Sequence, residues 1–439
     1  MENFITGYPG QEHEVRRAMK EEMGEEKYQF FFDKWMEYFF TPSDAKFLAS
    51  LGLNCIRIPF NHRHFMDDRN PDVIKKEGFK LLDRIIDACA AEGMYTILDL
   101  HTTPGGQNQA WHCDSGLHKA LFWDYKDHQD RVVQLWIELA KYYANNTWIA
   151  GYNPMNEPAD PEHVNVPLFY NRIEKEIRKV DPNHILFLDG NTYSMDFSAF
   201  KNILPNTVYA FHDYAGYGFP MREQYVATAE QDSVLQRQFD RKMVFMQEHG
   251  VPGWNGEWGP VYASPDDGDD YEKINEGRFK LLAKQLEIYR KAHMGHSIWL
   301  YKDIGFQGMV YASPNSAYMR LLKPFLEKKK RMGLDRWGRD DKYSGKYYEP
   351  LLEHLRSEIP EHLHNKRYPH MWGIEGHVYR VVRELFASEV LTYEYASYFK
   401  DKSFDELDEI AASFKLENCV QREELNRILK EDVQSSQTS

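Results

Sequence analysis

Two glutamates have sequence surroundings that suit acid–base chemistry. Glu157 lies in NPMNEPAD and Glu257 lies in GWNGEWGP, and each follows a run of strand-forming residues. Hydrolysis of a glycosidic bond needs two carboxyl groups on opposite sides of the anomeric carbon. One protonates the leaving oxygen, and the other attacks the carbon or activates water. Either glutamate alone could instead be a structural ion-pair partner, but as a pair they suit this reaction.

Other polar and aromatic side chains also occur where strand-like segments end. They are Arg57, His101, Asn156, His212, Tyr214 and Trp299. In a parallel barrel the carboxyl ends of the strands form one rim, and the active site is built there. The alternatives are an ion pair at the rim for Arg57, core packing for Trp299, and buried histidines bonded to backbone for His101 and His212.

The elements that must position these residues alternate between strands and amphipathic helices, which predicts a parallel α/β fold. One example is Gly78 to Ala91, where apolar residues repeat at helical spacing. Seven strands are expected: Asn54 to Pro59, Tyr95 to His101, Ile149 to Glu157, Ile185 to Gly190, Thr207 to Tyr214, Val251 to Trp258 and Ser297 to Asp303. We therefore predict a (β/α)8 TIM barrel.

A barrel of eight strands needs one strand more than these seven, and the first strand is the one expected to be missing. Glu26 to Phe40 and Thr41 to Leu51 are helical in pattern, so neither supplies it. After about Gln307 the alternation stops. We expect a catalytic barrel over residues 1–315, a helical C-terminal extension over 316–430 and a disordered tail over 431–439.

Composition narrows the partners of this 439-residue chain. Its net charge is -14, which argues against nucleic acid or an anionic membrane as a partner, and a neutral substrate fits well. The aromatic content of 15% favours a carbohydrate substrate only weakly, because aromatic side chains stack on sugar rings but also fill protein cores. No signal peptide or cofactor motif is recognised, so a cytoplasmic enzyme without cofactor is expected, or an extracellular one if the N-terminus is truncated. The oligomeric state is left open.

Two smaller features receive structural interpretations. Cys113 is expected to lie in a loop as an exposed thiol. The H-x-H pair of His62 and His64 could serve a metal-dependent barrel hydrolase, but a solvent-facing loop is the preferred interpretation, so no metal is expected.

The chain resembles family 5 glycoside hydrolases over most of Glu2 to Tyr311. The resemblance is carried by Asn156-Glu157-Pro158, by Glu257 in GEWG, by Arg57 in IRIP, by His101 in DLH, by the His212-x-Tyr214 pair and by Trp299, all in chain order. It implies a retaining β-glycosidase with Glu157 as acid/base and Glu257 as nucleophile. The other six residues would bind substrate or support the two glutamates.

Within that family, DLHTTPGGQN and the ENFIT opening look similar to the exo-β-1,3-glucanase group and its fungal relatives. A β-glucoside or a β-glucan is the substrate that this resemblance implies. As the acid, Glu157 should have its pKa raised by the charge of Glu257. Two other hypotheses stay open: a non-catalytic carbohydrate-binding relative inactivated by the missing strand, and a metal-dependent hydrolase.

Overall fold

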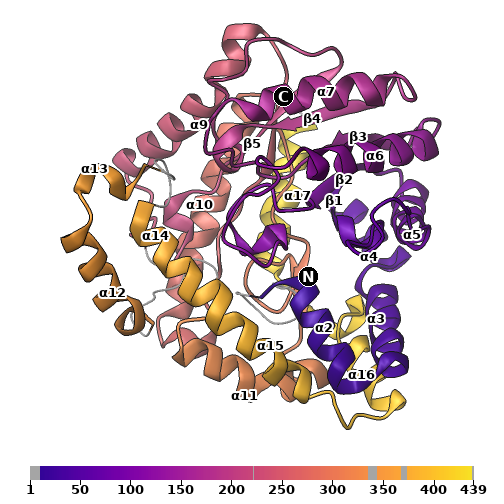
Figure 1. The fold of residues 1–439 in the computed structure, drawn as a ribbon, viewed down its shortest axis with the longest axis vertical. Helices are drawn as coiled ribbons and strands as arrows, with labels where there is room; N and C mark the ends of the chain where they lie inside the picture. The colour runs from indigo at the N-terminus through magenta and orange to yellow at the C-terminus, as the bar shows by residue number, and fades with distance from the viewer. Residues whose placement is uncertain (1–9, 221, 335–343, 367–372, 438–439) are drawn as a thin grey trace.

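The protein is described here by a computed structural model, which covers residues 10–220, 222–334, 344–366 and 373–437. Its centre is a seven-stranded parallel sheet whose strands follow one another in chain order (Figure 1). The strands are β1 (Cys55–Asn61), β2 (Tyr95–Thr102), β3 (Ile149–Asn153), β4 (Ile185–Asp189), β5 (Thr207–His212), β6 (Gly253–Glu257) and β7 (Gly295–His296). This curled parallel sheet with crossover helices confirms the predicted (β/α)8 architecture.

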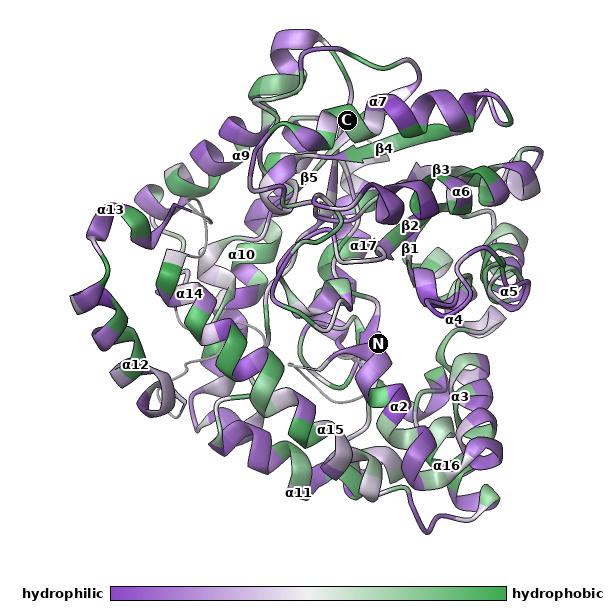
Figure 2. Cartoon of the chain, viewed as in Figure 1, coloured by the Kyte–Doolittle hydropathy of each residue, from purple (hydrophilic) through white to green (hydrophobic). Residues whose placement is uncertain are grey.

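The crossover helices bury one face against the sheet. They are α5 (Glu77–Ala91), α6 (Lys126–Tyr143), α7 (Asn165–Arg178), α8 (Asn191–Ser194), α9 (Ala229–His249) and α10 (Tyr271–Lys291). In α5, Leu82, Ile86 and Cys89 are buried at helical spacing. Figure 2 shows the consequence, with hydrophobic colour on β4 and mixed colours on the helices around the sheet. This apolar contact fixes the strands and therefore the rim that carries the polar residues.

Further helices lie at the two ends of the chain. They are α2 (Glu12–Met23), α3 (Glu25–Phe39), α4 (Pro42–Ser50), α11 (Ala317–Arg331), α12 (Gly345–Glu358), α13 (Glu361–His364), α14 (Gly373–Arg380), the π-helix η5 (Val381–Ala387), α15 (Ser388–Ser397), α16 (Phe404–Ala412) and α17 (Glu423–Gln437). Of these, α2, α3, α11, α15 and α16 share a second apolar core, whereas α4 and α17 pack into the core of the sheet and α12 and α14 form a small third cluster. Phe31 and Trp35 of α3 pack with Tyr395 and Phe399, and α2 and α3 lie beside α15 and α16 (Figure 1). The helical extension is therefore present, and it packs mainly against the N-terminal helices. The domain boundary at 315 remains a prediction.

Three details differ from the sequence prediction. The predicted strand from Ser297 to Asp303 is wrong. The seventh strand of the sheet is β7, which ends before Ser297, and Trp299 follows it. A separate small sheet joins β8 (Lys302–Asp303), β9 (Val310–Ala312) and β10 (Cys419–Gln421). Residues 431 to 437 of the expected disordered tail are helical, since α17 continues to Gln437.

In the described part of the chain, β1 and β7 are the two edges of the sheet. A cavity of about 290 Å³ is lined by residues of both strands and by apolar side chains such as Leu82 and Ile298.

Among the described residues, no helix combines the length and the apolar character that crossing a membrane requires.

One buried ion pair joins the chain after β7 to α4. Lys302 Nζ lies 2.6 Å from Asp44 Oδ1, and neither side chain is exposed to solvent. Replacing Lys302 with methionine should lower the free energy of unfolding by about 3–5 kcal/mol, because it leaves a buried carboxylate without its cation. Chemical denaturation measures this change. Lys126→Met is the matched control, since Lys126 and Asp130 form an exposed pair and its loss should cost less than about 1 kcal/mol. Equal effects of the two variants would contradict the prediction.

Candidate active site

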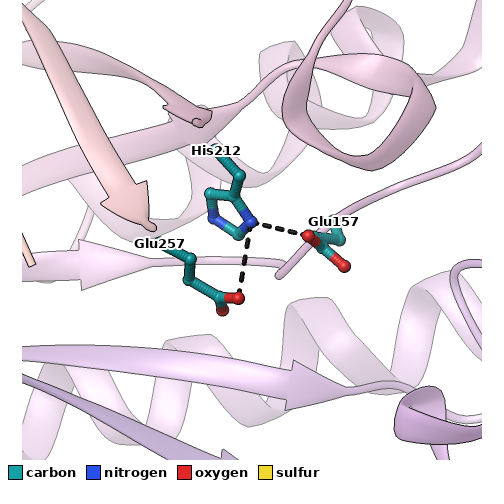
Figure 3. Close-up of side chains that lie close together, drawn as sticks. All are labelled: Glu157, His212 and Glu257. Carbon is teal, nitrogen blue, oxygen red and sulfur yellow. Dashed lines mark hydrogen bonds and ion pairs between the residues drawn. The ribbon is translucent and has the colours of Figure 1, made fainter. Parts of the chain in front are cut away.

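The two glutamates singled out by the sequence meet at the carboxyl end of the sheet. Glu257 is the last residue of β6, and Glu157 follows β3 by four residues. A carboxylate oxygen of each lies within 4.8 Å of one from the other, and His212 at the end of β5 stands between them (Figure 3). His212 Nδ1 is 2.7 Å from Glu157 Oε1 and 3.6 Å from Glu257 Oε2. All three side chains are buried, so water screens their charges only weakly.

Two donors hold the carboxylate of Glu257. Arg57 Nη1 donates to Oε1 at 2.8 Å, and the Tyr214 hydroxyl donates to Oε2 at 3.0 Å. Burial lowers the pKa of Arg57, but the charges of Asp99 and Glu257 raise it by more, so the guanidinium stays charged. Both oxygens of Glu257 are therefore stabilised in the ionised form and fixed in direction.

Arg57 is itself held by Asn156 and by two residues that the sequence interpretation did not select, Asn153 and Asp99. Its Nε and Nη2 donate to Asn153 Oδ1, Nη2 donates to Asn156 Oδ1 at 2.7 Å, and Nη2 lies 3.1 Å from Asp99 Oδ2. Burial raises the pKa of Asp99 to about 7, although the charge of Arg57 lowers it. Asp99 and Asn153 are polar residues inside buried strands, which is the signal that could have identified them.

The backbone of Glu157 has an unusual conformation. Its φ is 44°, in the left-handed region that a side chain with a Cβ seldom adopts. Its N–H donates to Asp189 Oδ2 at 2.9 Å, and its carbonyl accepts from Asn108 Nδ2 at 2.9 Å. These two buried bonds hold the strained residue with its side chain facing Glu257, as strain at functional sites requires.

The side chain of Glu157 is flanked by two histidines. His112 Nε2 lies 3.1 Å from Oε2, on the other side of the carboxyl from His212. Burial raises the pKa of Glu157, but hydrogen bonds donated by His112 and His212 lower it by more. The expectation that the charge of Glu257 would raise this pKa is therefore wrong in the free protein. His112 was missed because nothing in a loop sequence indicates where its side chains point.

The pKa of His212 is shifted in the opposite direction. Burial lowers this pKa, but the charges of Glu257 and Glu157 raise it by more, so it lies above 6.5. The charged ring then stabilises the fold fully below pH 6.5, and this contribution is lost as the pH rises through the raised folded-state pKa. Asp189, 3.6 Å from Nε2, also favours the charged ring.

We therefore predict that the stability advantage of the wild type over His212→Asn falls between pH 6 and pH 9. Asparagine can keep a neutral hydrogen bond near Nδ1 but cannot take up a proton. The expected change in the difference between the two free energies of unfolding is on the order of 1 kcal/mol. Denaturant titrations of both proteins at each pH measure it. A difference that stays constant or grows with pH would contradict the assignment.

The remaining predicted residues form one wall of the site. The rings of His101 and Trp299 stack at 5.4 Å with an angle of 8° between them. His101 Nδ1 lies 2.8 Å from Asp99 Oδ2, and burial lowers the pKa of His101 to about 3, so its ring is neutral. Asn156 Nδ2 is 3.4 Å from His101 Nε2. The structure thus brings all eight predicted residues together, and His101 is bonded to a carboxylate, not to backbone as its alternative interpretation supposed.

Two smaller expectations were wrong. His62, in the short helix η1 (His62–His64), is buried and its Nδ1 lies 2.8 Å from Thr102 Oγ1, so this segment is not a solvent-facing loop. His64 Nε2 lies 3.3 Å from Glu12. Cys113, in the short helix η2 (Trp111–Cys113), is buried and its thiol donates to the carbonyl of Asn108 at 3.3 Å.

Glu157, His212 and Glu257 are close enough to bind a metal ion in principle. However, Glu257 already has the Arg57 guanidinium at 2.8 Å, and a divalent cation at the same carboxylate would be repelled by that charge. The donor set suits proton transfer and covalent attack better than metal binding.

Comparisons with known proteins agree with this geometry. The model of the family described as cellulase (glycosyl hydrolase family 5) matches residues 17–304. A β-xylosidase of Phanerodontia chrysosporium is 52% identical over 440 residues, which cover 99% of this chain and 92% of that protein. A probable glucan 1,3-β-glucosidase A of Aspergillus clavatus is 27% identical over 42% of this chain and 45% of its own. A solved hyperthermophilic endo-β-1,4-glucanase superposes with a TM-score of 0.51 at 18% identity, covering 62% of this chain and 84% of that one.

Proposed function

The chain belongs to glycosyl hydrolase family 5, and we propose that it is a retaining β-glycosidase that works by double displacement through Glu257 and Glu157. The observation that carries the proposal is the approach of the two carboxylates to within 4.8 Å. Retaining enzymes place these groups about 5–5.5 Å apart, whereas inverting enzymes leave about 6.5–9.5 Å for a water molecule. The short separation supports direct attack by one carboxylate on the sugar.

The proposed roles follow from the contacts of each glutamate. Glu257 attacks the anomeric carbon, because Arg57 and Tyr214 keep it ionised and aimed. Glu157 protonates the leaving oxygen as the bond to the aglycone breaks. It then removes a proton from the water that displaces Glu257 from the sugar. Asn156, fixed by Arg57, is proposed to bond the sugar 2-hydroxyl, and Trp299 to stack on the sugar ring at the cleavage site.

We propose a β-xyloside as the preferred substrate class, because the 52% identical relative is a β-xylosidase. A β-glucoside or β-glucan is the second candidate, supported by the glucan 1,3-β-glucosidases at 27 to 28% identity over less than half of the chain. Both sugars present a β-linked anomeric carbon on which the same two carboxylates can act. The choice between them depends on room for the additional hydroxymethyl group of glucose.

The test is a comparison of kcat/KM for p-nitrophenyl β-xyloside, β-glucoside and β-mannoside, with the anomer of the first product followed by NMR. We expect the highest kcat/KM for the xyloside and release of the β-anomer. A higher value for the glucoside would favour the second candidate. Initial release of the α-anomer would overturn double displacement itself.

A further inference from the structure

Gln107 links the backbones of two strand ends that carry site residues. It lies in the loop after β2 and is completely buried. Its Nε2 donates to the carbonyl of His101 at 2.8 Å and to the carbonyl of Asn156 at 2.9 Å. One buried amide therefore joins the backbone of His101 to the peptide group that leads into Glu157.

The residues before Gln107 explain how its side chain reaches back to β2. In Thr103-Pro104-Gly105-Gly106, the N–H of Gly106 donates to the carbonyl of Thr103 at 3.0 Å, and the φ of Gly105 is 76°. Proline in the second position and glycine with positive φ in the third are typical of a tight turn, which reverses the chain.

The orientation of the Gln107 amide is fixed by the same turn. Its Oε1 accepts from the backbone N–H of Thr103 at 3.1 Å. Because a backbone N–H can only donate, the oxygen must lie on this side, and the two hydrogens of Nε2 are directed to the carbonyls of His101 and Asn156.

The backbone of Gln107 binds the same segment a second time. Its carbonyl accepts from the N–H of Ala159 at 3.0 Å. Gln107 therefore contacts the residues on both sides of the Glu157-Pro158 pair, Asn156 through its side chain and Ala159 through its main chain.

These contacts matter because Glu157 is in a strained conformation. Its φ is 44°, whereas the residue before a proline normally has a negative φ. The peptide group that precedes Glu157 is held at both ends, its carbonyl by Gln107 and its N–H by Asp189 Oδ2 at 2.9 Å. If φ relaxed to a negative value, the Cα–Cβ bond would change direction and the carboxyl would move relative to Glu257.

We propose that Gln107 is a positioning residue for Glu157: its amide holds the peptide group of this strained residue in register with the carbonyl of His101. This inference rests on the proposed function, in which Glu157 is the general acid. The ring of His101 stacks on Trp299, the proposed platform for the sugar. Gln107 thus sets the proton donor relative to the surface on which the sugar lies, and a small displacement of such a donor lowers the rate of proton transfer.

The test replaces Gln107 with methionine, which has a similar length but no amide. At fixed pH, kcat/KM is measured for the phenyl and the 2,4-dinitrophenyl β-glycoside of the same sugar, because dinitrophenolate departs without a proton. We expect a loss of about tenfold with the phenyl glycoside and of less than about threefold with the dinitrophenyl glycoside. The ratio between the two substrates does not depend on how much of the variant is folded.

Gln107→Glu is the second variant, in case the methionine variant does not fold. It can still accept from Thr103 but cannot donate to both carbonyls, so the ratio should shift in the same direction. The matched control is Gln129→Met. Gln129 Nε2 donates to the carbonyl of Phe122 at 3.1 Å, a bond that does not involve the backbone around Glu157, so its ratio should equal that of the wild type.

Two results would overturn the positioning role of Gln107. One is an equal loss on both substrates in Gln107→Met, which a merely structural role would give. The other is a ratio that stays at the wild-type value in the Gln107 variants that fold. Wild-type protein inactive on both substrates would instead overturn the proposed function.

Discussion

Replacing Glu257 with alanine should lower kcat on an aryl β-glycoside by about 10⁴-fold or more, because the variant lacks the carboxylate that we propose forms the covalent intermediate. In the structure both oxygens of Glu257 receive donors, from Arg57 and Tyr214, as an ionised nucleophile of the proposed mechanism requires. The fold should survive, since Arg57 keeps its hydrogen bonds to Asn153 and Asn156 and its contact with Asp99 at 3.1 Å. Steady-state rates and a melting curve of the same preparation measure both expectations.

Glu287→Ala is the control for that variant. Glu287 lies on α10, is partly exposed and pairs with Lys284 and Lys291, so its loss should leave kcat unchanged. Azide provides a second check, because it can enter the space left by the missing carboxylate and attack the sugar directly. The product should then be the α-glycosyl azide. A Glu257→Ala protein that keeps more than about a tenth of wild-type kcat would contradict the assignment.

Replacing Glu157 with alanine should give the second largest effect, and its size should depend on the substrate. For a phenyl glycoside we expect kcat/KM to fall by about 10²–10⁴-fold, the contribution of a general acid. For a dinitrophenyl glycoside the first step should be nearly unchanged, because that leaving group departs without a proton. The intermediate should then accumulate, since no base activates water, and a burst of dinitrophenol should be measured by stopped flow.

Azide distinguishes the two glutamates. In Glu157→Ala it should attack the covalent intermediate from the face of the missing acid/base and release the β-glycosyl azide, raising the turnover of the dinitrophenyl substrate. Equal losses on both substrates, or formation of the α-azide, would contradict the role of Glu157. Opposite anomers from the two variants would be difficult to explain by any mechanism in which the glutamates act only as ion-pair partners.

The sequence predicted most of the barrel because strands buried on both faces are apolar until their last positions. As expected, Glu257 is the last residue of β6 and His212 is the last residue of β5. Because neighbouring parallel strands end at the same edge of the sheet, the two side chains lie close together. The prediction of strand bounds was less accurate where a strand pairs with its neighbour over only a few residues. Ser297 to Asp303 has the apolar character of a strand, but only Gly295–His296 pairs with β6, and Trp299 lies in the connection that follows.

The supporting residues of the site were harder to predict. Asn153 donates a hydrogen bond to Asp189 and accepts one from Arg57, and Asp189 accepts one from the N–H of Glu157. In the sequence, each of the two appears only as a polar residue near the end of an apolar strand. The position of the His112 side chain depends on the path of a loop, and neither hydrophobic periodicity nor composition specifies that path. The downward shift in the pKa of Glu157 follows from hydrogen bonds with His212, which was predicted in the site, and with His112, which was not, so its sign could not be obtained from the two glutamates alone.

The central claim is that Glu257 bonds covalently to the sugar, while Glu157 protonates the leaving oxygen and later removes a proton from water. One measurement tests this claim most directly. The protein is incubated with a 2-deoxy-2-fluoro β-glycoside bearing a dinitrophenyl leaving group, digested, and its peptides are mapped by mass spectrometry. We predict one sugar attached to the peptide that contains Glu257, at Glu257. A sugar on any other residue, or turnover of the parent glycoside with no trapped adduct and release of the inverted anomer, would contradict the account.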